Sequence, residues 1–84
     1  MLARGWWRMS VQAASGRTVQ TLRQVRLALV AVIRAHERVA RLLVALGDHD
    51  GAGAERRAAE GERARLARLD ARLVALGDPG PNGP

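Results

Sequence analysis

The chain contains no cysteine, lysine, tyrosine or phenylalanine among its 84 residues, and its three prolines all lie at the C-terminal end. The absence of cysteine excludes disulfide bonds and any thiolate zinc site. A chain this short buries only about 60% of its unfolded surface, which leaves little margin for stability. We therefore expect self-association to supply the burial that covalent or metal cross-links cannot.

Side chains that could catalyse a reaction or bind a metal ion are also scarce. Serine is limited to Ser10 and Ser15, and no paired carboxylates fall at expected core positions. His49 lies between Asp48 and Asp50, but three adjacent side chains on a flexible loop cannot all converge on one metal ion. An enzyme also needs a concave pocket, which two helices do not provide. We expect no enzyme, no cofactor, no metal site and no small-molecule substrate.

The charge balance is strongly basic, with a net charge of +6 and a pI near 11.7. Such a balance favours polyanionic partners. All basic residues are arginine, and alanine, arginine, glycine and proline make up half of the chain. A GC-rich genome explains this bias without selection for guanidinium groups. The same bias leaves open that the chain is a translated GC-rich frame without a selected function.

Helix-forming residues dominate two stretches, which contain no proline and are separated by a glycine-rich segment. Gly47 and Gly77 follow the two stretches, as helix C-caps require. The sequence VALGD closes both of them. The predicted segments are a flexible Trp/Arg arm over 1–9, helix one over 10–46, a Gly-rich loop over 47–54, helix two over 55–76 and a disordered Pro/Gly tail over 77–84.

Apolar side chains recur at alternating intervals of three and four residues in both predicted helices. This spacing is typical of the a/d seam of a coiled coil. The predicted seam consists of Leu22, Val25, Leu29, Val32, His36, Val39, Leu43 and Leu46 in helix one and Leu66, Leu69, Leu73 and Leu76 in helix two. It predicts an all-α antiparallel hairpin with a long first helix and a shorter second helix. We expect the hairpin to self-associate into a helical bundle.

His36 is the one polar member of the predicted seam. A polar side chain at an a position can specify register, and protonation of a histidine there could weaken an interface. The alternative is a tolerated, partly exposed polar residue.

Apolar side chains outside the seam indicate a second contact surface. Leu27 and Val30 lie away from the seam and Ile33 widens it, so one short helix cannot cover all three. The alternative is that they are ordinary exposed apolar side chains. Trp6 and Trp7, which lie beside arginines, suit an anchor in a partner pocket or a membrane interface. They could instead rest on helix one, or precede a true start at Met9.

The arginines of helix one supply the alternative to protein binding. The candidate phosphate contacts are Arg23, Arg34, Arg38 and Arg41. Helix two mixes arginines with four acids, and no recognised nucleic-acid motif or aromatic platform accompanies the arginines. Charged residues interrupt every window long enough to cross a bilayer, so we expect no transmembrane span.

These patterns favour a non-enzymatic helical interaction protein, acting as an adaptor, a regulator or a small subunit of a larger assembly. Its expected partner is a second copy or another helical protein. The alternative is non-specific binding of nucleic acid or an anionic surface by the arginines of helix one. We expect a cytoplasmic location. The acid-poor, Arg-rich stretch before Glu37 is similar to a mitochondrial targeting segment, which would apply only to a eukaryotic source.

Overall fold

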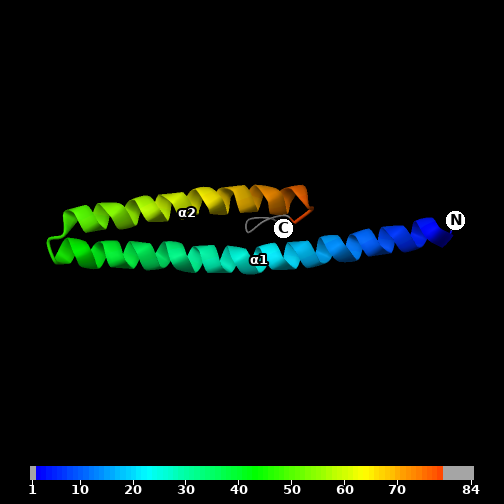
Figure 1. The fold of residues 1–84 in the computed structure, drawn as a ribbon, viewed down its shortest axis with the longest axis horizontal. Coiled ribbons are helices and arrows are strands. Elements are labelled where there is room, and N and C mark those ends of the chain that lie inside the picture. Colours follow the sequence, from blue (N-terminus) through cyan, green and yellow to red (C-terminus); the bar gives the residue numbers. More distant parts are fainter. Residues whose placement is uncertain (1, 79–84) are drawn as a thin grey trace.

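The chain folds as two antiparallel helices that lie side by side (Figure 1). A computed structural model describes the backbone of residues 2–78 and the side chains of residues 16–78. Helix α1 spans Leu2–Ala45 and helix α2 spans His49–Ala75. The molecule is about 69 Å long and 20 Å wide. The N-terminal part of α1 extends beyond the end of α2 and accounts for part of this length. The predicted all-α hairpin of unequal helices is confirmed.

Both helices begin earlier in the chain than predicted. Residues 2–9, which we expected to form a flexible arm, belong to α1. The loop is only three residues long, Leu46 to Asp48, because α2 begins at His49 within the segment expected to be the loop. The side chains of Trp6 and Trp7, and residues 79–84 of the tail predicted over 77–84, lie outside the described residues.

The early start of α2 has a local cause in its N-cap. The Asp48 carboxylate accepts a hydrogen bond from the backbone N–H of Gly51 at 2.8 Å, which satisfies one of the free donors of the first turn. A Cβ atom on residue 51 would lie 2.4 Å from Asp48 Oδ2, so glycine is the residue that leaves room for this cap. Ala52 is then fully buried against α1. Capping and burial together outweigh the low helix propensity of the glycines.

The repeated VALGD sequence is explained by two copies of one helix C-cap. Gly47 and Gly77 adopt positive φ angles of 82° and 94°, which glycine accepts without strain. At the end of α1, the N–H of Gly47 donates to the carbonyl of Val44 and the N–H of Asp48 donates to Leu43. The same two bonds recur thirty residues later, from Gly77 and Asp78. This pattern is a Schellman motif, so the repeat reflects a shared way of ending a helix.

The contact between the helices is narrow and is built largely from small side chains. Among the described residues, the buried ones are Ile33 and Ala40 on α1 and Ala52, Ala59 and Leu73 on α2. Alanine at three of these five positions lets the two backbones approach closely. Half-buried side chains complete the contact line, which is Leu22, Arg26, Leu29, Ile33, His36, Ala40 and Leu43 on α1 and Ala52, Glu55, Ala59, Glu62, Leu66, Leu69 and Leu73 on α2.

On α2, the contact with α1 includes Leu66, Leu69 and Leu73 of the predicted seam but not the exposed Leu76, and on α1 it includes every second residue of that seam. Leu22, Leu29, His36 and Leu43 belong to both lines. Between them the structure uses Arg26, Ile33 and Ala40, each one residue after the expected valine. Val25, Val32, Val39 and Leu46 are all exposed. One residue rotates a helix face by about 100°, so the three valines lie to one side of the contact with α2, and Leu46 lies beyond the end of α1.

Candidate interaction surfaces

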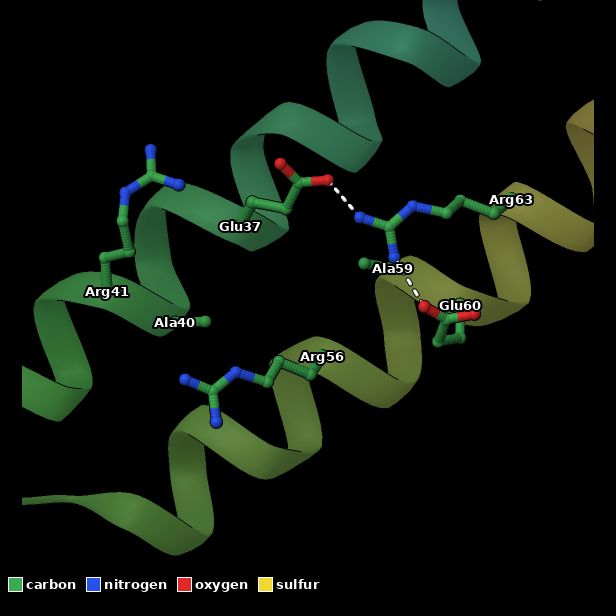
Figure 2. A pocket seen from close by; sticks show the side chains of 7 residues that line it. All are labelled: Glu37, Ala40, Arg41, Arg56, Ala59, Glu60 and Arg63. Atoms are coloured by element: carbon green, nitrogen blue, oxygen red, sulfur yellow. Dashed lines mark hydrogen bonds and ion pairs between the residues drawn. The ribbon is translucent and has the colours of Figure 1, made fainter.

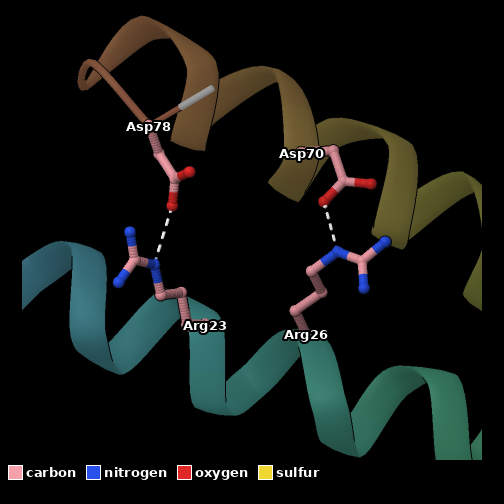
Figure 3. Close-up of polar contacts among 4 residues, drawn as sticks. All are labelled: Arg23, Arg26, Asp70 and Asp78. Atoms are coloured by element: carbon pink, nitrogen blue, oxygen red, sulfur yellow. Dashed lines mark hydrogen bonds and ion pairs between the residues drawn. The ribbon is translucent and has the colours of Figure 1, made fainter. Parts of the chain in front are cut away.

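The two polar members of the contact line on α1, Arg26 and His36, each have an acidic partner on α2. Arg26 Nε donates to Asp70 Oδ1 at 2.8 Å, with both side chains about three-quarters buried (Figure 3). His36 Nδ1 lies 2.5 Å from Glu55 Oε2. The Glu55 carboxylate thus gives the half-buried His36 a polar partner within the hairpin.

A further ion pair fastens the C-terminal end of α2 to α1. Arg23 Nε donates to Asp78 Oδ2 at 2.8 Å, and Asp78 is the last residue of the second VALGD sequence (Figure 3). In the first copy the equivalent carboxylate, that of Asp48, instead caps α2. The two aspartates of the repeat thus have different roles. Arg23, expected to be a phosphate contact, is committed to an ion pair within the hairpin.

One side of the hairpin, which we call the ion-pair face, carries a shallow polar pocket. Arg63 bridges Glu37 of α1 and Glu60 of α2 (Figure 2). The pocket has a volume of about 300 Å³ and is lined by Glu37, Ala40, Arg41, Arg56, Ala59, Glu60 and Arg63. Within the described part of the chain, Arg41 and Arg56 have no ion-pair partner.

The opposite side of the hairpin carries a continuous apolar stripe on α1. We call it the apolar face; it consists of Val25, Ala28, Val32, Ala35, Val39, Leu42 and Leu46. These residues follow one another at intervals of three and four, so they line one side of the helix over about six turns. All except the half-buried Ala35 are exposed, and Leu42 and Leu46 retain 64% and 82% of their accessible surface.

The relation between the two faces follows from the order of residues along each helix. Residues of the apolar face up to Leu42 directly precede residues of the contact line, whereas Glu37 directly follows one. Arg63 likewise follows a contact residue on α2, and it meets Glu37 across the hairpin. Residues that precede contact residues on both helices must therefore share the other side. On α2 these are Gly51, Ala54, Ala58, Gly61, Arg65, Arg68 and Arg72.

The residues that we expected to bind a partner do not share one exposed surface in the structure. Ile33 is only 7% exposed and packs in the contact with α2, so its assignment to a free surface was wrong. Val30 is half-buried beside the same contact. Leu27 is 63% exposed but lies away from both the contact line and the apolar face. Ala28 and Ala35, which the sequence reasoning did not single out, join the exposed valines into one stripe.

The remaining candidate phosphate contacts face solvent. Arg34, Arg38 and Arg41 are exposed, and none of them has an ion-pair partner among the described residues. On α2, Arg63 and Arg65 have carboxylate partners three residues earlier, whereas the other arginines of this helix have no ion-pair partner among the described residues. Three of the four unpaired arginines among the described side chains of α1 lie in its C-terminal half, and the fourth is Arg17.

Over the described part of the chain, no group of three or more histidine, aspartate or glutamate side chains is placed to hold a metal ion. Neither described helix contains an apolar stretch long enough to cross a membrane.

Comparison of the chain with protein-family models, with curated proteins and with solved structures finds no match. A functional proposal therefore rests on the residues and their arrangement.

Proposed function

We propose that this chain is a non-enzymatic interaction protein that packs the apolar face of its hairpin against another helical surface. The observation that carries the proposal is the uninterrupted apolar stripe of seven residues, of which all but the half-buried Ala35 are exposed. Large contiguous apolar patches on protein surfaces mark interaction sites far more often than scattered single side chains do.

The arrangement of α1 supports this proposal. The contact line and the apolar face are offset by one residue, which places them about 100° apart around the helix axis. A helix inside a four-helix bundle meets its two neighbours at about this angle, since the helices lie near the corners of a square. The side of α1 that meets α2 includes Arg26 and His36, whereas the apolar face contains no polar residue. The more apolar of the two surfaces is thus the one that still lacks a partner.

The experiment compares two leucines of equal exposure on the same helix. Leu42 belongs to the apolar face and Leu27 does not, and they retain 64% and 63% of their surface. A photo-reactive amino acid is placed at each position in turn, the chain is expressed in the cells it comes from, and cross-linked polypeptides are identified by mass spectrometry. We expect a defined adduct from position 42 and none from position 27. Absence of any adduct from position 42 would refute the proposal.

A second candidate is non-specific binding of nucleic acid or another polyanion by α1. The observation that favours it is the group of unpaired arginines Arg34, Arg38 and Arg41, to which Arg56 adds a fourth guanidinium at the pocket of the ion-pair face. DNA affinity should then fall steeply with salt concentration, with a slope set by the number of phosphates contacted. Replacing Arg34 and Arg41 with glutamine should reduce that slope by about two. No retention on DNA at low salt would exclude this function.

A further inference from the structure

We infer that the surface covering the apolar face is a second copy of this chain, bound antiparallel about a two-fold axis that passes near Ala35. This inference rests on the proposed function and names its partner. Such a dimer would be a four-helix bundle in which the two α1 helices pack against each other. Each α1 would contact its own α2 through the contact line and the other α1 through the apolar face.

The exposed area of the chain is of the size that a stable dimer requires. The hairpin exposes 6465 Å², whereas a globular monomer of its 9.1 kDa mass exposes about 4,900 Å². Part of the excess belongs to the N-terminal end of α1, which extends past α2. The excess is about twice the roughly 800 Å² that each partner buries in a standard interface. The hairpin thus exposes more surface than a globular chain of its mass, and the apolar face is part of that surface.

The order of side-chain sizes along the apolar face favours the antiparallel arrangement. Ala35 is at the centre of the stripe, Ala28 lies seven residues before it and Leu42 lies seven residues after it. An axis through Ala35 therefore sets each Ala28 opposite a Leu42 and brings each Val32 within one residue of the level of a Val39. A small side chain then meets a large one, two valines meet each other, and the paired Ala35 side chains let the helices approach most closely at the axis. A parallel dimer would instead set Ala28 against Ala28 and Leu42 against Leu42.

The side of α2 that adjoins the apolar face also pairs small side chains of one copy with large side chains of the other. The register of the hairpin sets Ala35 beside the middle of α2, since Glu37 meets Arg63 and Arg41 shares a pocket with Arg56. The first half of α2 presents Gly51, Ala54 and Ala58 on this side, and its second half presents Arg65, Arg68 and Arg72. The same two-fold axis therefore brings three long arginine side chains of one copy over three small residues of the other.

Charge supports the same arrangement. The small residues of α2 lie next to the loop, where Asp48 and Asp50 are exposed. Arg72 and Arg68 of a second copy would approach this acidic end. Opposite charges placed across an interface favour the correct orientation of two chains and disfavour alternatives. The acidic residues at the loop end of the hairpin and the arginines at the far end of α2 thus favour an antiparallel partner that carries the same sequence.

The closing experiment uses the purified full-length chain, whose lack of cysteine makes single-cysteine variants unambiguous. Sedimentation equilibrium measures the oligomeric state over about a hundredfold range of concentration, where the melting temperature of a dimer should also depend on concentration. The Ala28→Cys and Leu42→Cys variants are then oxidised separately and as a mixture. We expect a dimer, and disulfide formation between A28C and L42C chains with little between identical chains. Ala35→Cys should link to itself.

Each other outcome overturns the inference in a recognisable way. A chain that stays monomeric over the whole concentration range has no second copy on its apolar face. In that case, a cross-link from position 42 to a different polypeptide would still support the proposed function. Self-linking of A28C and of L42C would indicate a parallel dimer. A dimer in which none of the three variants forms a disulfide uses another surface. An Ala64→Cys variant, at an exposed position of α2 away from the apolar face, controls for random collision.

Discussion

Replacing Ile33 and Val32 with alanine, one at a time, tests which of two neighbouring residues holds the hairpin together. Ile33 is 7% exposed in the contact with α2, whereas Val32 is 41% exposed on the apolar face. The predicted seam assigns the packing to Val32 and the structure assigns it to Ile33. The two substitutions remove similar apolar groups from adjacent positions of one helix, so differences in their effects report on the side chain's surroundings.

The expected magnitudes follow from burial. Truncating a buried isoleucine to alanine costs about 2–5 kcal/mol, and the low end applies here because the contact is a single layer of side chains. Val32 loses two carbon groups worth about 0.8 kcal/mol each when fully buried. Its exposure reduces that loss to about 1 kcal/mol. Alanine is the better helix former and returns up to about 0.5 kcal/mol in both variants. We expect Ile33→Ala to destabilise the hairpin by about 2 kcal/mol and Val32→Ala by less than about 0.5 kcal/mol.

The assay is urea denaturation followed by circular dichroism at a low protein concentration, where sedimentation shows the chain to be monomeric. An unchanged m-value would show that both variants unfold from a state of the same compactness. At high concentration Val32→Ala should also lower the midpoint, because the apolar face is then covered. A loss from Val32→Ala at low concentration that equals or exceeds the loss from Ile33→Ala would refute the assignment of the contact line.

Three further predictions concern single features of the hairpin. A double-mutant cycle between Arg26→Gln and Asp70→Asn should give a coupling energy of about 1 kcal/mol, since this ion pair is largely shielded from water. Gly47→Ala should destabilise the protein by about 1 kcal/mol because of the positive φ angle, whereas Gly61→Ala, in open space within α2, should stabilise it by a similar amount in thermal unfolding. Asp48→Ala should cost about 1 kcal/mol through loss of the N-cap, measured in the same way, and Asp48→Asn, which keeps an acceptor, should cost less.

The two helices and their C-terminal ends could be predicted from local patterns. Long stretches of strong helix formers, together with Gly47 and Gly77, predicted two helices of unequal length and where each ends. The start of α2 was missed because its cap depends on a contact between Asp48 and Gly51 that resembles an ordinary glycine-rich loop in sequence. The extension of α1 to Leu2 was missed because two adjacent tryptophans and Gly5 show no helical period.

The residues of the interaction surface could be predicted only in part from the sequence. The valines of α1 were recognised as one line of side chains, but they were assigned to the contact with α2 because they are more apolar than Arg26 and Ala40. The signal for the observed line was present in the charges: Arg26 and His36 can be placed in a helix contact only where acids face them, and α2 supplies Asp70 and Glu55. Hydrophobicity alone does not identify such a line.

The sequence by itself determined that this protein forms two helices, because helix propensity and capping depend on residues close together in the chain. It also determined that α1 carries more apolar surface than one shorter helix can cover. Only the tertiary structure decided which side of α1 meets α2. That choice depends on ion pairs such as Arg26 with Asp70, 44 residues apart, and on the close approach that Ala40 and Ala59 permit. These interactions form only once both helices are in place. The side of α1 that meets α2 is therefore offset by one residue from the predicted seam at the valines, which stay exposed.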